Sequence, residues 1–314
     1  MRVAIIDIGS NTAHMCVYDV PQDVAGYRPK RVFKVKKQLG LAAYVDESGC
    51  LSAEGEQRCG DAVEELAYIA RTSGIDRICA FATAAIRQAE NGREVAERVG
   101  RRCGLEIEVI SSRQEALMGF QAISHELDLD HGVLVDIGGG SSEVVRFAGG
   151  HQVLVLGMPL GSLRLFRDYV DDVLPSAKER VRMEDAVEGS QRKPGWAALG
   201  ESDVLCAIGG SSRAALKLIR RCCPEEVLGS SFSSKALDDL LDRFAKDRRF
   251  AVRAITQVCP DRVHTVIPGM LILRHLCHSV RAERIVVGSF GVREGYLLER
   301  IVGERVEEEG QDNE

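Results

Sequence analysis

The sequence lacks the features of membrane-spanning and secreted proteins. No stretch reaches the roughly eighteen apolar residues that a membrane-spanning helix needs. The N-terminus runs directly into the apolar segment Val3–Asp7 and shows no signal-peptide cleavage pattern. We therefore expect a cytoplasmic protein with no membrane partner.

Paired cysteines are also missing. The chain has 10 cysteines, but none stands in the Cys-x-x-Cys spacing of structural zinc sites and thioredoxin-like redox centres. We interpret them as reduced residues of the core. Adjacent Cys222 and Cys223, and Cys277 with His275 and His278 nearby, leave a weak metal site as the less favoured alternative.

Basic charge and aromatic side chains are scarce. The net charge is −6, whereas a broad grip on nucleic acid needs a basic face, so we expect no nucleic-acid partner. Only 5% of the residues are aromatic, which leaves no obvious platform for stacking a nucleobase. Hydrophobic residues, in contrast, make up 45% of the sequence, as in ordinary globular proteins. The length of 314 residues suits two domains of roughly 100–200 residues each.

One strand–turn–strand pattern occurs twice. The apolar run Arg2–Ile6 leads into Asp7-Ile8-Gly9-Ser10-Asn11-Thr12, and a second run, Met15–Val20, follows. The segment Gly132–Ser142 again reads as a buried strand that ends in Asp-Ile-Gly and small residues, with Glu143–Phe147 as the return strand. The two patterns lie about one domain length apart, which favours two similar folds.

Further segments alternate between strand and helix patterns. Apolar runs predict strands at Arg31–Lys36, Arg77–Ala82, Leu105–Ile110, Val204–Ile208 and Ile285–Val287. Apolar spacing and capping residues predict helices at Ala53–Arg71, Glu94–Gly104, from Ser112, at Ser176–Val187 and, after a third glycine-rich turn at 208–212, at Arg213–Arg221. This alternation predicts an α/β fold of mixed sheets with helices packed on them.

Domain limits follow from the repeated pattern. We place an N-terminal domain at residues 1–123 and a C-terminal domain at 124–303, whose last helix can pack back on the first. Residues 304–314 are acidic and are expected to fray.

The glycine-rich turns suit a phosphate group. Backbone N–H groups that converge at a turn bind phosphate oxygens, and glycine allows close approach because it has no Cβ. A tight hairpin turn without a ligand is the alternative for either turn alone. The residues that we predict to bind phosphate are Gly9, Ser10, Asn11, Thr12, Gly138, Gly139, Gly140, Ser141, Ser142, Gly209 and Gly210.

Carboxylates stand beside two of these turns. Asp7 and Asp136 end the strands, where a Mg²⁺ or Mn²⁺ ion that bridges phosphate oxygens would find hard oxygen ligands. Glu143 is a further candidate for the same metal. An aspartate at a strand end is otherwise a common turn former.

These motifs resemble those of a known family. Asp7–Thr12 and Asp136–Glu143 look like the two phosphate motifs of the exopolyphosphatase and guanosine pentaphosphate phosphohydrolase (Ppx/GppA) family, in the actin-like ATPase superfamily. Ala82–Arg87, Ile110–Ala116 and Ser289–Gly295 resemble three further motifs of the family, so the resemblance covers nearly the whole two-domain body.

The resemblance implies a fold and a chemistry. It implies two actin-like (ribonuclease H-like) domains, each a mixed sheet flanked by helices, with an interdomain cleft, divalent-metal dependence and terminal phosphate hydrolysis. It makes Glu115 the general base that activates water. It also implies that Arg87 either neutralises charge on the transferred phosphoryl group or binds the next phosphate. A homodimer is also consistent with the family.

Some residues depart from the family pattern or have a structural alternative. Ser112 replaces a usual glycine, Gln114 replaces one of two paired acids, and His264 stands where aspartate is common. Because 112–115 reads as a capping box, Glu115 could simply satisfy a backbone N–H. Arg293 and Glu294 could be an ion pair that holds the final helix.

The favoured function is that of an exopolyphosphatase, which releases terminal orthophosphate from inorganic polyphosphate by in-line attack of water. Hydrolysis of the 5′ terminal phosphate of guanosine pentaphosphate is the alternative within enzymes of this kind. A non-catalytic nucleotide- or polyphosphate-binding regulatory module and a sugar or acetate kinase of the same superfamily are alternatives of other classes.

Overall fold

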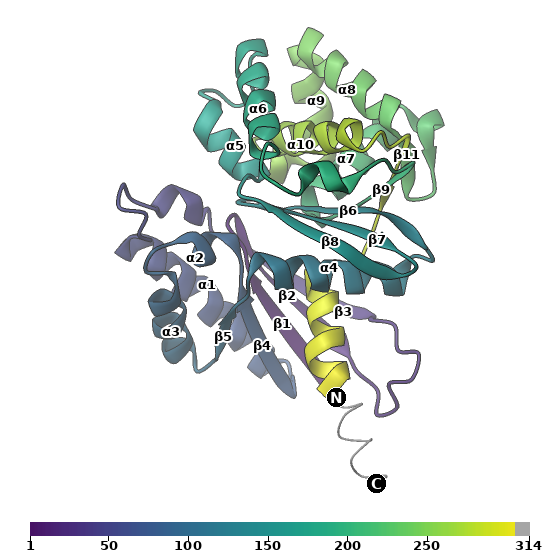
Figure 1. The fold of residues 1–314 in the computed structure, drawn as a ribbon. Helices are drawn as coiled ribbons and strands as arrows, with labels where there is room; N and C mark the ends of the chain where they lie inside the picture. The colour runs from purple at the N-terminus through teal and green to yellow at the C-terminus, as the bar shows by residue number, and fades with distance from the viewer. Residues whose placement is uncertain (305–314) are drawn as a thin grey trace. The chain divides into compact units, whose positions relative to one another are not determined.

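The computed structural model describes residues 1–304 and divides the chain into two compact units (Figure 1). Unit 1 consists of Met1–His125 and the segment that starts at Val292, and unit 2 is Glu126–Gly291. The helical segment after Val292 thus groups with unit 1. In the prediction from the sequence, this segment belongs to the domain 124–303, with a last helix that can pack back on the first domain. Of the expected acidic tail, Glu304 forms an ion pair with Arg77, at 2.7 Å, and the rest lies outside the described residues.

Unit 1 contains a five-stranded mixed sheet in the order β3-β2-β1-β4-β5. The strand β1 pairs antiparallel with β2, which forms the predicted hairpin, and parallel with β4 on its other side. The strands are β1 (Arg2–Ile8), β2 (Thr12–Asp19), β3 (Arg31–Gln38), β4 (Arg77–Ala82) and β5 (Ile107–Val109).

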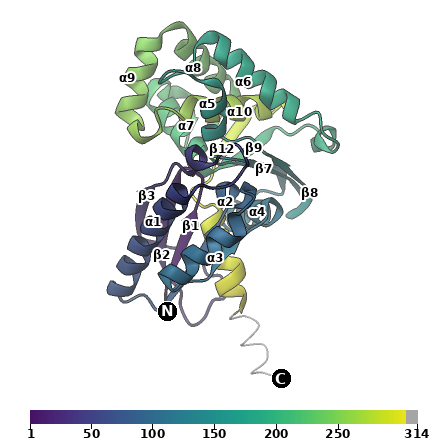
Figure 2. The same ribbon diagram turned by 90° about the vertical axis from the view of Figure 1, so that its left-hand side faces the viewer.

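Helices cover both faces of this sheet. Alternate residues of β1 point to opposite faces, and both sets are apolar, so each face needs helices to bury it. Ala4 and Ile6 share a core with α1 and α3, whereas Val3 and Ile5 share one with Met118 of α4 and with the C-terminal helices. Figure 2 views the unit from the side of α1 and α3. The helices are α1 (Ala53–Thr72), α2 (Ala84–Gln88), α3 (Gly92–Cys103), α4 (Ser112–Glu126), α11 (Val292–Tyr296) and the π-helical turn η5 (Leu297–Val302).

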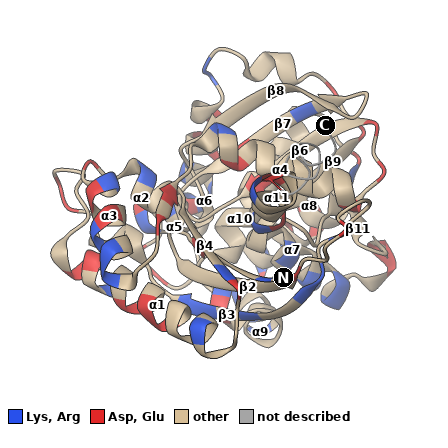
Figure 3. Cartoon of the chain, turned by 90° about the horizontal axis from the view of Figure 1, so that it is seen from below, with Lys and Arg blue, Asp and Glu red and all other residues tan. Residues whose placement is uncertain are grey.

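Ion pairs link the outer faces of α1 and α3. Arg98 bonds Glu56 at 2.7 Å, and Arg102 lies 2.5 Å from Asp61 and 2.6 Å from Glu64. Figure 3 shows the two signs of charge interspersed on these helices. Exposed pairs of this kind contribute roughly 0.2–1 kcal/mol each, so they tune the surface while the apolar core supplies most of the stability.

Unit 2 contains a seven-stranded sheet in the order β10-β11-β12-β9-β6-β7-β8. The strand β6 pairs antiparallel with β7 and parallel with β9. The strands are β6 (His131–Ile137), β7 (Ser142–Ala148), β8 (His151–Met158), β9 (Val204–Ile208), β10 (Val227–Leu228), β11 (Ser231–Ser233) and β12 (Arg284–Val287).

One large apolar core joins this sheet to its helices. It includes Val133, Val135 and Ile137 from β6 and buried residues from the helices packed above them. The helices are α5 (Ser162–Tyr169), α6 (Ala177–Ser190), α7 (Gly209–Cys222), α8 (Ser234–Lys246), α9 (Arg248–Val258) and α10 (Val266–Ser279). No helix among residues 1–304 is long and apolar enough to cross a membrane.

The two sheets share one plan, which confirms the predicted α/β fold of two similar mixed sheets flanked by helices. In each unit a hairpin and a third antiparallel strand are followed by a parallel strand beside the first strand of the hairpin. The third glycine-rich turn differs from its prediction. Its residues Gly209–Ser212 form the first turn of α7, because a first helical turn needs no intrahelical acceptors for its N–H groups and so tolerates glycine.

Gly295 allows α11 to lie directly against α4. A Cβ at this position would fall 1.9 Å from the carbonyl oxygen of Met118. We predict that Gly295→Ala lowers the free energy of unfolding by at least about 1–3 kcal/mol, because the backbones must separate. In Gly189→Ala, a helical site with nothing within 4 Å, stability should rise by up to about 1 kcal/mol. Urea denaturation of both variants measures this, and equal stabilities would contradict the close contact.

Candidate functional site

The glycine-rich turn of unit 2 is held from one side by the start of α5. The carbonyl oxygen of Gly138 accepts from the backbone N–H of Ser162 at 2.9 Å and from its hydroxyl at 3.1 Å. The carbonyl oxygen of Gly139 accepts from the N–H groups of Leu163 and Arg164, both at 3.0 Å. The first N–H groups of α5, which have no partner inside the helix, thus bind the carbonyls of the turn.

This arrangement fixes where the amides of the turn point. In a trans peptide the carbonyl oxygen of one residue and the N–H of the next point in opposite directions. The N–H groups of Gly139 and Gly140 therefore face away from α5, and neither has an acceptor among the residues that the structure describes. Converging free N–H groups are the donors that bind phosphate oxygens.

Gly161 lets the start of α5 approach the turn within hydrogen-bonding distance. A Cβ there would lie 2.5 Å from both the carbonyl carbon and the carbonyl oxygen of Gly139. Only glycine at position 161 lets the α5 start reach the turn. Gly161 was not predicted as a site residue, because it lies far from the turn in sequence and its role depends on the fold.

The turn of unit 1 repeats the arrangement. The N–H of Gly9 bonds the carbonyl of Thr12 at 3.0 Å, as the N–H of Gly138 bonds the carbonyl of Ser141 at 3.0 Å. The segment after β3 holds the turn: Leu41 donates to the carbonyl of Ser10, and Leu39 to that of Asn11, each at 2.8 Å. The same trans-peptide geometry then directs the N–H of Asn11 away from this segment.

Asp136 and Glu143 lie on one face of the unit 2 sheet. They are direct partners in the antiparallel register of β6 and β7, so their side chains project to the same side. A Cβ at Gly209 would lie 2.3 Å from Oδ1 of Asp136, so the start of α7 packs on this carboxylate. Glu143 accepts a hydrogen bond from the Ser141 hydroxyl at 2.8 Å.

This donor set fits a divalent cation. Mg²⁺ is typically held by one or two carboxylates together with water and substrate phosphates, and Asp136 and Glu143 supply that number. Within residues 1–304 no cluster of three or more acidic, histidine or cysteine side chains forms a metal cage. Such a site would therefore depend on the substrate for further ligands.

Asp7 in unit 1 has a different environment from Asp136. Its carboxylate accepts from the guanidinium of Arg293 at 3.2 Å. Burial raises the pKa of Asp7, and the charge of Arg293 opposes that rise. Glu294 beside it accepts from the buried hydroxyl of Tyr18 at 2.6 Å. A metal at Asp7 would have to share this carboxylate with Arg293. Asp136 and Glu143 of unit 2 therefore match the predicted metal role better.

The structure brings the predicted catalytic pair together. Nη1 of Arg87 donates to Glu115 at 2.7 Å and to the carbonyl oxygen of Ile110 at 3.0 Å. Both side chains are largely buried, with exposed fractions of 16% for Arg87 and 11% for Glu115. The guanidinium offsets the cost of burying the Glu115 carboxylate. Residues from α2 and α4 thus meet at the carboxyl ends of the parallel strands β4 and β5.

The capping box at the start of α4 falls one residue earlier than the sequence suggested. The side chain of Gln114 accepts from the backbone N–H of Ser111 at 2.8 Å, and the Ser111 hydroxyl accepts from the N–H of Gln114 at 3.2 Å. Gln114, a departure from the family pattern, therefore has a capping role. The Glu115 carboxylate meets Arg87 instead.

His264, another departure, packs beside an aromatic ring. Its ring meets that of Phe166 edge-on, with centroids 5.3 Å apart. Burial, and secondarily the charge of Arg262, lower the pKa of His264. We therefore expect a neutral imidazole at this position near neutral pH.

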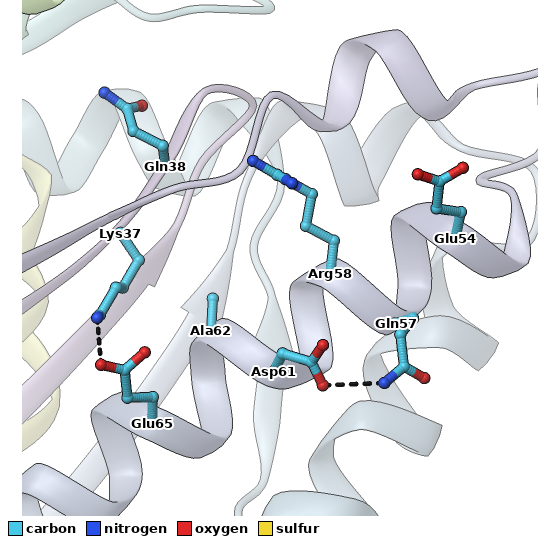
Figure 4. Close-up of a pocket in the computed structure, with 8 residues that line it drawn as sticks. All are labelled: Lys37, Gln38, Glu54, Gln57, Arg58, Asp61, Ala62 and Glu65. Carbon is cyan, nitrogen blue, oxygen red and sulfur yellow. Dashed lines mark hydrogen bonds and ion pairs between the residues drawn. The ribbon is translucent and has the colours of Figure 1, made fainter.

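A separate hollow of about 410 Å³ lies between the end of β3 and α1 (Figure 4). It is lined by polar side chains, including Lys37 and Glu65, which form an ion pair, and Gln57 and Asp61, which share a hydrogen bond of 3.0 Å. None of the predicted site residues lines it in the described part of the chain.

Comparison with known proteins places these motifs in a family. The sequence profile of the Ppx/GppA phosphatase family matches residues 20–303, about nine-tenths of the chain. The chain belongs to the Ppx/GppA phosphatase family. The membership that the motifs suggested is thereby confirmed at the level of the family.

Relatives of this Ppx/GppA protein agree with the assignment. Exopolyphosphatase 1 of Mycobacterium tuberculosis is 27% identical over 311 residues, which is 97% of this chain and 89% of that protein. The Ppx/GppA protein of Aquifex aeolicus has the same fold, with a TM-score of 0.77 and 24% identity over 97% of this chain and 98% of that one. An exopolyphosphatase from Cytophaga hutchinsonii gives a TM-score of 0.81 at 20% identity, covering 96% and 98% of the two chains.

The close contact at Gly161 predicts a binding defect. In Gly161→Ala the added methyl must displace the turn, so the amides of Gly139 and Gly140 lose their direction. We expect tripolyphosphate to bind at least about tenfold more weakly, because each charge-assisted hydrogen bond contributes roughly 1.5–3 kcal/mol. Isothermal titration calorimetry measures it, with Gly189→Ala of the same unit as control. Unchanged affinity in a folded variant would contradict the role of the turn.

Proposed function

We propose that the protein is an exopolyphosphatase that releases terminal orthophosphate from inorganic polyphosphate. The observation that carries the proposal is the buried Glu115 carboxylate, held by Arg87 at the carboxyl ends of parallel strands. The family assignment and the mycobacterial relatives named exopolyphosphatase 1 support the same substrate class.

Glu115 acts as the general base. Hydrolysis of a phosphoanhydride needs a carboxylate that orients the attacking water and accepts its proton. Arg87 holds one carboxylate oxygen at 2.7 Å and so restricts the orientation of the Glu115 side chain. The proton moves from water to Glu115 as the water oxygen attacks the terminal phosphorus in line. The bond from that phosphorus to the bridging oxygen breaks, and the shortened polyphosphate leaves with the electron pair of that bond, so orthophosphate is released and no covalent phosphoenzyme forms.

Arg87 has a second role as a source of positive charge. Its guanidinium has five N–H donors, of which Nη1 serves Glu115 and Ile110. Its planar, permanently charged guanidinium can stabilise the charge that develops on the transferred phosphoryl group. The turns at Gly9–Thr12 and Gly138–Ser142 supply neutral amide donors to the phosphate oxygens.

Asp136 and Glu143 are the residues that we propose to hold a Mg²⁺ or Mn²⁺ ion. A bound divalent ion would neutralise charge on the phosphate oxygens of the substrate. Asp7 is a secondary candidate, because Arg293 already neutralises its carboxylate.

The base assignment predicts the behaviour of Glu115→Gln. This change keeps the shape of the side chain and removes the proton acceptor, so kcat for orthophosphate release should fall roughly 10²–10⁴-fold. Binding of polyphosphate should stay within a few-fold of wild type. Phosphate release and calorimetric titration with short-chain polyphosphate measure the two properties. The control is Glu106→Gln, the same chemical change at an exposed carboxylate of unit 1.

The outcomes separate the alternative functions. Undiminished release by Glu115→Gln would refute the base assignment. Faster release from guanosine pentaphosphate than from polyphosphate would make the protein a pentaphosphate phosphohydrolase. Strict dependence on an acceptor sugar or acetate would indicate a kinase, and binding without any turnover would indicate a regulatory module.

The metal assignment predicts a dependence on divalent cations. Treatment with a chelator should abolish orthophosphate release, and added Mg²⁺ or Mn²⁺ should restore it. Asp136→Asn removes one of two proposed carboxylate ligands and should raise the metal concentration needed for half-maximal activity at least about tenfold. Asp130→Asn, an exposed acid of unit 2, serves as the control. Full activity in chelator would contradict the assignment.

A further inference from the structure

The two sheets have four terminal strands, and three of them are protected against pairing with another chain. A terminal strand presents unpaired backbone N–H and C=O groups, which proteins guard with short strands or charged side chains. The strand β10 of unit 2 has only two residues, and the strand β5 of unit 1 only three. The strand β3 has four cations among its eight residues, which are Arg31, Lys34, Lys36 and Lys37.

The fourth terminal strand, β8, lacks both kinds of protection. Its eight residues, His151–Met158, include no acid, lysine, arginine or proline (Figure 3). It pairs with β7 on one side, and its backbone has no other hydrogen-bond partner in the part of the chain that the structure describes. The N–H and C=O groups on the outer side of β8 are therefore open to a further strand.

A β-bulge interrupts only the first part of β8. The register with β7 shifts at Val153, which has no partner across the ladder. A bulge of this kind hinders edge-to-edge pairing where it occurs. From Leu154 to Met158, however, the register with β7 is continuous. A regular run of five residues therefore remains available for pairing.

Apolar side chains lie along the same edge. The side chain of Val153 is 66% exposed. Leu154 and Leu156 are only partly buried, at the margin of the unit 2 core. The 3-10 helix η2 (Trp196–Leu199), which packs on β8, adds two exposed alanines. A strand added to β8 would thus bury apolar surface and also give the open backbone groups their partners.

We propose that β8 of one copy of this chain pairs antiparallel with β8 of a second copy, so that the protein is a symmetric homodimer with a sheet continued from one unit 2 into the other. An uncharged edge needs a partner strand of similar length without charge, and among the terminal strands described above only β8 itself has these properties. A twofold axis brings the same surface of both copies together and leaves neither edge open. The inference is independent of the proposed function.

Analytical ultracentrifugation over a range of protein concentrations tests the dimer. The wild type should change from monomer to dimer at micromolar concentrations, because one strand edge is a small interface. Val153→Lys places a cation on the edge of each copy and should raise the dissociation constant of the dimer at least about tenfold. Val153 is exposed, so the variant should fold, and circular dichroism and thermal unfolding of the monomer check this.

Two control variants separate the charge from its position. Val153→Thr keeps a neutral, β-branched side chain at the same place, so it should dimerise like wild type. Val181→Lys makes the same chemical change at another exposed valine of unit 2, on α6, and should also dimerise like wild type. A dissociation constant that rises equally in Val153→Lys and Val181→Lys would overturn the proposal, because it would reflect net charge alone.

Hydrogen–deuterium exchange locates the interface. The outer amides of β8 gain hydrogen-bond partners in the dimer, so peptides that cover residues 151–158 should exchange more slowly at high than at low concentration of wild type. The same peptides of Val153→Lys should show no such dependence under conditions where that variant is monomeric. A wild type that stays monomeric through the high micromolar range would overturn the proposal. So would a dimer in which exchange of 151–158 is unchanged.

Discussion

The hydrogen bonds between the carbonyls of a glycine-rich turn and the start of the next helix are the constraint on which the site depends. In unit 2 the N–H groups of Ser162, Leu163 and Arg164 hold the carbonyls of Gly138 and Gly139. Because the peptide is planar and trans, holding the carbonyls determines the direction of the amides. Under our proposal, a phosphate bound at this turn would meet donors that need no rearrangement, which reduces the entropic cost of binding.

The same device recurs in unit 1 with different residues, where the chain from Leu39 to Leu41 holds Ser10 and Asn11. Arg58 of α1 in turn donates to the carbonyl of Leu39 at 2.6 Å and so supports that segment. The charged side chains near the two turns are arranged differently in the two units. Unit 1 pairs its acids with arginines, as in Glu115 with Arg87, whereas unit 2 sets two carboxylates side by side in register. This difference suits a base in one unit and a cation in the other.

Much of the fold could be predicted from local sequence patterns. The hairpins, the strand Arg77–Ala82 and the helix after Ser111 depend on residues that are close in sequence. The resemblance added Arg87 and Glu115, which the structure places 2.7 Å apart. Contacts across long sequence separations were not predictable. Gly161 meets the turn at Gly139 only because the fold brings the two residues together. The helices α8, α9 and α10 were also not predicted, and Gly209 was assigned to a turn because glycine disfavours helix interiors.

The most direct test of the account is whether the turn amides bind phosphate. Backbone amide NMR of the Glu115→Gln variant, titrated with tripolyphosphate, observes them without turnover. The account predicts that the amide resonances of Gly139, Gly140 and Asn11 shift downfield in a saturable manner and are among the largest changes in the spectrum. Binding that leaves these three amides unshifted, while resonances elsewhere move, would contradict it.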